Sequence, residues 1–224
     1  MSLTPMKEKL IEENNFPSRH FTTIKLCADM KDEAARNVLL HSLGLDVDNL
    51  VLAKQPHGNN VAIVTKKHKG SFINDCDGLI TADKDIMLGV FTADCMPVLM
   101  VSKDKSKSAK AVVHAGWKGL ASGILINTVK IFKEGFGVNP ETLAVYIAPH
   151  IKECCYEVSA DFGDIFETKL KNCRLNLAAV ACKILEKEGV NGIYVSPHCT
   201  CCESDLFFSY RRDKTADRMI TIVL

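Results

Sequence analysis

Apolar residues recur along the chain with two different periods, and segments of the two kinds alternate. A helical spacing over residues 31–43 predicts a helix that ends at Gly44. Short apolar runs over residues 50–53 and 61–65 predict two strands, which we expect to form a hairpin joined by the turn that carries His57. The first third of the chain therefore mixes helix and strand.

Two further apolar strands lead directly into polar side chains. Residues 86–91 run into the segment that ends at Cys95, and residues 111–113 end at His114. Helical spacing then predicts one helix from Trp117 to Phe136. Its first turn would direct unpaired backbone N–H groups, which can bind phosphate or a carboxylate, toward His114.

The rest of the chain continues in the same way, with strands predicted over residues 143–147, 193–195 and 219–223 and helices over 160–169 and 175–188. No internal repeat or low-complexity linker separates these elements. The pattern predicts an α+β fold, a single domain with a mixed β-sheet core and packed helices.

Composition agrees with a globular enzyme. The chain has 224 residues, 47% of them hydrophobic, and a formal net charge of +1, which favours one domain and argues against a nucleic-acid partner. The ten cysteines occur in a long chain that begins without an apolar signal core and has no run of about 20 apolar residues. We therefore expect reduced thiols, a cytoplasmic location and no membrane partner.

His57, Cys95 and His114 are candidate metal ligands, because each lies beside a glycine or proline at a predicted strand end or turn. Imidazole and thiolate are ligands that zinc prefers, and three protein ligands leave a position for water or substrate, as in a catalytic site. The same residues could instead serve separately as a core thiol and two hydrogen-bonding imidazoles. Asp75, Asp77 and Asp83 are expected to shape turns around Gly78, and one of them could orient a ligand imidazole.

Three segments carry a resemblance to a known family: TADCMPVLM (residues 92–100), VVHAGWKGL (112–120) and FFSYRRDKTADRM (207–219). They resemble the YfiH-like or laccase-domain family, also called the polyphenol oxidase or peptidoglycan editing factor family, whose members have been assigned purine nucleoside phosphorylase activity. KQPHGNNV (54–61) and CCYEV (154–158) add to the resemblance. It implies a lead-in segment over residues 1–27 and a YfiH-like catalytic domain over residues 28–224.

The resemblance implies a metal-dependent purine nucleoside phosphorylase, with nucleoside and phosphate as its small-molecule partners and adenosine deamination as a side activity. His57, Cys95 and His114 would hold zinc, with copper as the alternative ion. Within the third segment, Arg211 or Arg212 would bind phosphate through a guanidinium fork. Lys118 stands where the family usually has arginine and would supply a further cation.

Several alternatives use the same residues. A copper phenol oxidase is disfavoured because the chain has only seven histidines and no His-x-His pair. Cys95 could be a nucleophile with His114 or His57 as its base, which would give a hydrolase or amidase. A cytoplasmic protein that edits peptidoglycan precursors is the third alternative. The sequence sets no oligomeric state.

Five of the remaining cysteines form two dense groups, Cys154-Cys155 and Cys199-Thr200-Cys201-Cys202. A second zinc site built from them would require two remote segments to converge, and the resemblance gives these cysteines no such role. We therefore do not expect a second metal site.

Overall fold

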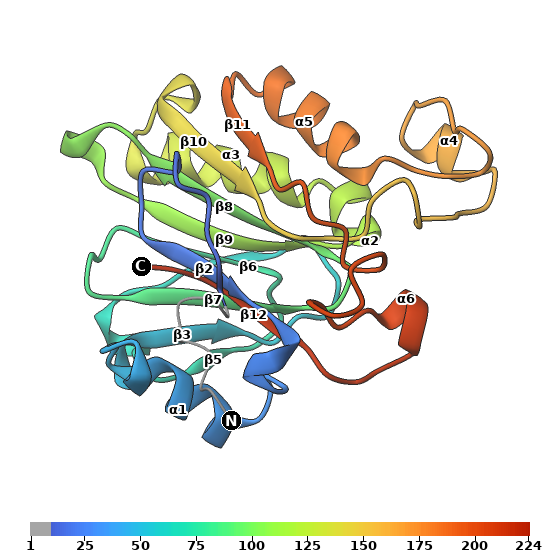
Figure 1. Ribbon diagram of the computed structural model, residues 1–224. Coiled ribbons are helices and arrows are strands. Elements are labelled where there is room, and N and C mark those ends of the chain that lie inside the picture. Colours follow the sequence, from blue (N-terminus) through green and yellow to red (C-terminus); the bar gives the residue numbers. More distant parts are fainter. Residues whose placement is uncertain (1–9) are drawn as a thin grey trace.

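Two six-stranded sheets pack face to face, with helices on both outer faces (Figure 1). The computed structural model describes residues 10–224. The order in the first sheet is β1-β2-β12-β7-β3-β5: Leu10–Ile11, His20–Thr23, Met219–Val223, Met87–Thr92, Leu50–Ala53 and Phe72–Ile73. The order in the second sheet is β11-β10-β8-β9-β6-β4: Gly192–Val195, Leu143–Ile147, Met96–Ser102, Lys110–Ala115, Gly78–Thr81 and Val61–Ile63.

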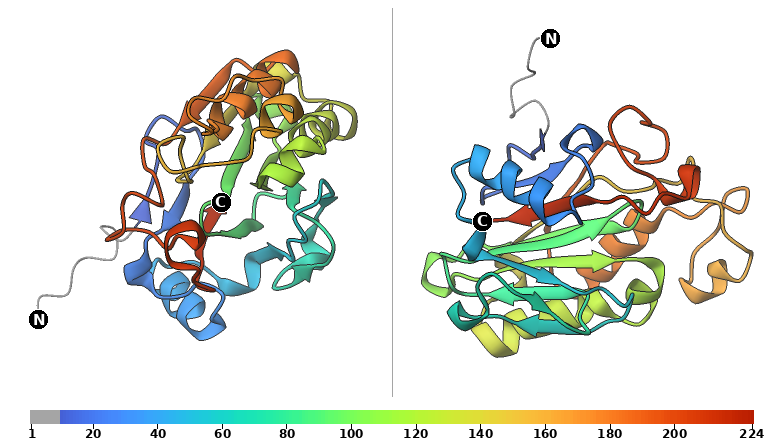
Figure 2. Two further views of the ribbon diagram at one scale, coloured as in Figure 1. Left: turned by 90° about the vertical axis from the view of Figure 1, so that its right-hand side faces the viewer. Right: turned by 90° about the horizontal axis from the view of Figure 1, so that it is seen from below.

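The helices are α1 Glu33–Ser42, α2 Trp117–Ala121, α3 Ile124–Phe136, α4 Phe162–Ile165, α5 Leu177–Lys187 and α6 Tyr210–Asp213. Short 3-10 turns cover Lys25–Cys27, Val47–Asn49, Lys66–His68, Lys105–Lys107 and Pro140–Thr142. α1 covers the first sheet, whereas α3 and α5 cover the second (Figures 1 and 2). None of the helices between residues 10 and 224 has the length and apolar character needed to cross a bilayer.

The sequence of strand β7 is continuously apolar because both faces of the strand are buried. Its side chains alternate between two cores: Met87 and Phe91 pack toward α1, whereas Leu88 and Val90 pack against the other sheet. All six of its residues are buried. A strand with two buried faces needs no polar positions, so it reads as an unbroken apolar run.

The structure confirms the α+β class and most of the predicted elements. Strands β10 and β12 have the predicted bounds, and α1 and α5 lie within their predicted ranges. Residues from the expected lead-in segment supply β1 and β2, and β2 pairs with β12.

Three local predictions are wrong. β3 and β4 belong to different sheets, so the His57 turn connects two layers and does not close a hairpin. The predicted helix from Trp117 to Phe136 is broken at Gly123, whose φ of +89° is left-handed. Because α2 is only five residues long, it lacks the extended helix dipole that the sequence predicted. The helix predicted over 160–169 forms only one turn, α4.

Two connections between the sheets determine where functional side chains can gather. The segment after β7 passes from the first sheet to β8 in the second, and the segment after β3 passes to β4 in the second. Both carry a candidate ligand, Cys95 and His57 respectively. The end of β9, where His114 lies, is adjacent to β8, with His114 opposite Pro97.

Candidate active site and metal centre

His57, Cys95 and His114 come together at this end of the two sheets. Their potential ligand atoms all lie within 4.8 Å of one another. The two imidazole rings are nearly perpendicular, with centroids 4.7 Å apart. His114 is buried, Cys95 is half-buried and His57 is exposed, so the group has one open side.

Asp77, at the residue before β6, braces two of these three side chains. Its Oδ1 accepts hydrogen bonds from Nδ1 of His114 at 2.7 Å and from the backbone N–H of His57 at 3.0 Å. Its Oδ2 accepts from the backbone N–H of Gly58 at 2.6 Å, and the residue is fully buried. Because Nδ1 of His114 carries the proton in this bond, Nε2 is left with its lone pair as a ligand. Of the three aspartates around Gly78 that the sequence offered for this role, Asp77 is the one that bonds to a candidate ligand imidazole.

The close group also changes the acidities of its members. Burial acts to raise the pKa of Cys95, but hydrogen bonds and positive charge from His114 and His57 outweigh it and lower that pKa to about 6. Burial acts to lower the pKa of His114, but bonds to Asp77 and Cys95 raise it to about 9. Without a metal, Cys95 and His114 therefore form a thiolate–imidazolium pair at neutral pH.

Asp94 is a buried residue beside the candidate site whose contacts the sequence did not predict. It has a left-handed φ of +94°, which is unusual for a residue other than glycine, and its carboxylate is buried. The carboxylate accepts hydrogen bonds from the hydroxyls of Thr200 and Ser209 and from the backbone N–H of Arg211. These contacts fix the turn that presents Cys95 and attach the C-terminal segment to it. The segment TADC marked this turn, but a carboxylate that bonds more than 100 residues away gives no local signal.

A cavity of about 800 Å³ opens over the three side chains. Its cationic lining residues are Lys31, Lys54, Arg211, Lys214 and Arg218. Its aromatic lining residues are Phe72, Phe91, Trp117, Tyr156 and Tyr210. Asp94, whose carboxylate is already hydrogen-bonded, is the acidic residue in the lining. The cavity thus offers flat apolar surfaces together with positive charge.

The structure separates the three predicted phosphate-binding residues. Arg211 lines the cavity, where its guanidinium lies over the ring of Tyr156 and donates to the backbone oxygen atoms of Cys155 and Glu157. Arg212 turns away and donates to the backbone oxygen atoms of three residues, Thr200, Cys201 and Phe207. Lys118 is exposed outside the cavity lining, with its ammonium group over the ring of Trp117. Arg211 is therefore the one of the three that is placed to meet a ligand in this cavity.

The space around the three side chains fits a metal ion. A Cβ atom at Gly116 would lie 3.2 Å from Sγ of Cys95, 3.6 Å from His57 and 3.8 Å from His114. Glycine at this position therefore keeps a side chain out of the space beside all three residues. One thiolate and two imidazoles are a donor set for zinc, and copper(II) binds such nitrogen and sulfur ligands more strongly.

The chain is similar to known proteins along nearly its whole length. The model of a family described as multi-copper polyphenol oxidoreductase laccase matches residues 19–224. A purine nucleoside phosphorylase of Clostridium acetobutylicum is 35% identical over 189 residues, which cover 80% of this chain and 78% of that protein. A purine nucleoside phosphorylase of Mycobacterium bovis is 31% identical over 218 residues, covering 91% and 85%.

Solved structures give the same picture. The hypothetical protein YfiH of Bacillus licheniformis superposes with a TM-score of 0.86 at 28% identity and covers 96% of this chain and 94% of that one. YlmD of Geobacillus stearothermophilus superposes with a TM-score of 0.85 at 26% identity and covers 96% and 98%.

Proposed function

The chain belongs to the multi-copper polyphenol oxidoreductase laccase family, the YfiH-like proteins, and from that membership we propose that it is a metal-dependent purine nucleoside phosphorylase. The reaction would convert a nucleoside and phosphate into a free base and a pentose 1-phosphate. The observation that carries the proposal is the cavity, which combines the Cys95 group with cationic and aromatic walls. Two relatives named purine nucleoside phosphorylase, at 35% and 31% identity, support it.

The cavity suits both substrates. A volume of about 800 Å³ lies within the range of small-molecule sites and exceeds what a purine nucleoside alone requires. Aromatic side chains such as Trp117 and Tyr156 can stack on a planar base. Arg211 and its cationic neighbours favour an anion in the same space, since the carboxylate of Asp94, the acidic residue in the cavity lining, is already hydrogen-bonded.

In the proposed reaction, a phosphate oxygen attacks the anomeric carbon while the bond from that carbon to the base nitrogen breaks. The base leaves with the electron pair of the bond and takes up a proton. Arg211 would hold the phosphate and balance its charge, and the cavity walls would align the two reactants. A zinc ion held by His57, Cys95 and His114 would supply a Lewis acid.

Tyr156 is placed to donate a hydrogen bond to the substrate. Burial and the nearby charge of Cys95 raise the pKa of its phenol to about 12, although Arg211 opposes them. The phenol therefore keeps its proton at neutral pH. We propose that it donates to the departing base or to a ribose oxygen.

A Cys–His hydrolase is the second candidate, because the sulfur of Cys95 lies beside the imidazole of His114, which is hydrogen-bonded to the carboxylate of Asp77. A nucleophilic cysteine would be active without metal and would be inactivated by alkylation. A ligand cysteine would be protected by zinc. Laccase chemistry has less support, since only one candidate metal group between residues 10 and 224 contains histidine.

The deciding experiment incubates protein of known metal content with inosine or adenosine, with and without phosphate, and identifies the products by mass spectrometry. Phosphate-dependent ribose 1-phosphate supports the proposal. Inosine formed from adenosine without phosphate would make deamination the main activity. If neither nucleoside reacts, the hydrolase and the peptidoglycan-precursor alternatives take its place. The cytoplasmic location stays a prediction from the cysteine content.

A further inference from the structure

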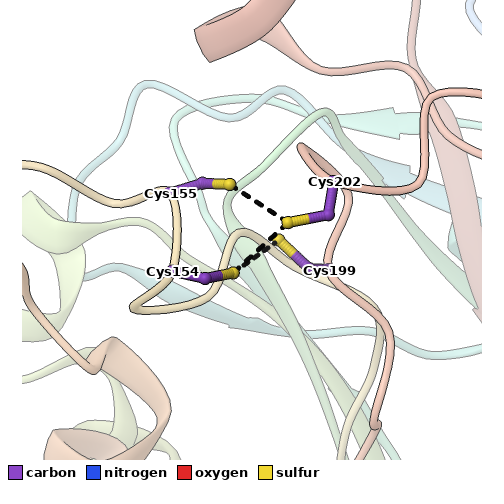
Figure 3. A group of neighbouring side chains, drawn as sticks. All are labelled: Cys154, Cys155, Cys199 and Cys202. Atoms are coloured by element: carbon purple, nitrogen blue, oxygen red, sulfur yellow. Dashed lines mark hydrogen bonds between the residues drawn. The ribbon is translucent and has the colours of Figure 1, made fainter.

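Four cysteines from two remote segments meet at one point of the surface (Figure 3). Cys154 and Cys155 lie in the segment after β10, and Cys199 and Cys202 lie in the segment after β11. β10 and β11 are parallel neighbours, so both segments leave the same end of the sheet. A further bridge pairs His150 with Cys199 and keeps the two segments together beyond the strands. The expectation that these segments stay apart is therefore wrong.

The sulfur atoms have the spacing of a tetrahedral metal site. Cys154 lies 3.6 Å from Cys199 and 3.4 Å from Cys202, and Cys155 lies 3.2 Å from Cys202, measured between Sγ atoms. All four sulfur atoms lie within 4.8 Å of one another. A tetrahedron with zinc–sulfur bonds of about 2.3 Å has edges of about 3.8 Å. The distances exceed the roughly 2.05 Å of a disulfide bond, so the four sulfur atoms lie separately around a common centre.

The surrounding backbone holds the sulfur atoms in place. The backbone N–H groups of Lys152, Cys201 and Cys202 lie near Sγ of Cys199. Glu203 closes the second loop: its Oε1 accepts from the backbone N–H of Cys199 and its Oε2 bonds to Nδ1 of His198, both at 2.7 Å. These contacts fix the backbone around the sulfur atoms, as a preformed site requires.

We propose that Cys154, Cys155, Cys199 and Cys202 form a second metal site, a closed tetrathiolate site for zinc. Four sulfur donors without imidazole or carboxylate favour zinc, and four protein ligands leave no position for substrate. Cys154 and Cys202 are exposed, which gives the ion a path in from solvent. Binding would release the thiol protons, and the ammonium group of Lys152, which lies near Cys199 and Cys154, would offset part of the resulting negative charge.

This site would stabilise one wall of the cavity without contacting the substrate. The carbonyl of Cys155 accepts from the guanidinium of Arg211, and Tyr156 follows directly in the chain. Thr200, between two of the cysteines, donates its hydroxyl to Asp94. Zinc would therefore tie the loop after β10 to the loop after β11, and through them hold Arg211 and Tyr156.

The experiment counts metal in the full-length protein, purified anaerobically with reductant, reconstituted with zinc and freed of excess ion. The expected content is two zinc ions per chain for the unmodified protein. The double variant Cys154→Ser/Cys202→Ser, which changes two exposed residues, should keep one. The double variant His57→Ala/His114→Ala should also keep one, and the combination of all four changes should keep none.

Cobalt substitution distinguishes the two sites by their ligands. The His57→Ala/His114→Ala variant should show strong sulfur-to-cobalt charge-transfer absorption, typical of four thiolates. The Cys154→Ser/Cys202→Ser variant should show the weaker absorption of one thiolate and two imidazoles. Cys201→Ser, in the same loop, and Cys173→Ser, on another exposed segment, are matched controls that should leave both spectra unchanged.

Two results would overturn the proposal. The first is that the His57→Ala/His114→Ala variant contains no metal, although the unmodified protein does and the variant keeps the thermal transition of a folded protein. The other is a mass-spectrometric peptide map of the reduced, anaerobic protein in which the two loops are joined by disulfide bonds. Neither readout depends on nucleoside turnover, so this proposal and the proposed function can fail separately.

Discussion

The two candidate metal-binding groups are built on different supports. Cys95 lies in the turn between β7 and β8 and His114 in β9, and the buried carboxylate of Asp77 braces this group. The four-cysteine group lies on two loops, and Glu203 closes the second of them through its bonds to Cys199 and His198. The first group opens into the cavity, whereas none of the four cysteines of the second lines it. A site on rigid sheets with one exposed donor is suited to catalysis. Four sulfur atoms on two loops are suited to a structural metal ion that cross-links the loops.

The largest expected effect tests the first group. Cys95→Ala should lower kcat/KM by at least about 1,000-fold, about 4 kcal/mol of barrier, because it removes the proposed thiolate ligand of the site. Steady-state phosphorolysis and metal analysis would measure this. Cys173→Ser is the control and should retain activity. A Cys95→Ala protein that kept full zinc at this site but no activity would favour the nucleophile model.

Asp77→Asn tests whether the buried carboxylate accounts for the rigidity of the first group. Three N–H groups donate to Asp77, and an asparagine amide would turn its own NH₂ toward at least one of them. We expect zinc affinity at this site, or activity, to fall about 10- to 100-fold. Competition with a chromophoric chelator would report the affinity. Asp85→Asn, at an exposed carboxylate, should change neither quantity.

Gly119→Ala tests how closely α2 must approach the His57 turn. A Cβ atom there would lie 2.6 Å from the carbonyl oxygen of Gly58, so the backbone would have to move. The expected loss is about 1–3 kcal/mol of unfolding free energy, measured by denaturant titration. Gly135→Ala in α3 meets nothing closer than 3.6 Å and should instead stabilise the protein by about 1 kcal/mol. Equal effects at both positions would contradict this account.

The smallest effect concerns thiol reactivity in zinc-free protein. The pKa of Cys95 is about 6, so its alkylation rate should rise through pH 6 and level off above about pH 7. Burial and the adjacent thiols of Cys202 and Cys199 raise the pKa of Cys154 to about 11, so its rate should still be rising at pH 9. Iodoacetamide labelling followed by peptide mass spectrometry would measure both. If the alkylation rates of the two cysteines depended on pH in the same way, the expected difference between their thiol pKa values would be contradicted.

The local hydrophobic pattern was sufficient to predict the strands whose residues are apolar throughout. β10 and β12 were predicted with their observed bounds, because their side chains are buried on both faces. β8 was not predicted, since it contains Pro97, which usually interrupts a strand. The hairpin prediction failed at His57 because proximity in sequence does not indicate which sheet a strand joins.

For the candidate site, too, the sequence identified residues but not how they are arranged. His57, Cys95 and His114 could be named from their motifs, but only the pairing of β8 with β9 and the two connections between sheets bring them together. Arg211 is favoured over Arg212 because the guanidinium of Arg212 bonds to backbone carbonyls away from the cavity. Two adjacent arginines in the sequence do not reveal which of them does so. The meeting of Cys154 with Cys202 depends on a parallel strand pair about 50 residues apart, which no local signal encodes.

The position of β12 has a consequence for synthesis. This strand lies between β2 and β7 in the middle of the first sheet (Figure 2), although the ribosome makes it after every other strand found between residues 10 and 224. At about 5–20 residues per second, the ribosome needs roughly 7–26 seconds to pass from the end of β7 to the end of β12. Until then, β2 and β7 have unpaired edges that can bind other chains. Slower aggregation at low temperature, or a chaperone that covers these edges, should therefore raise the yield of native protein.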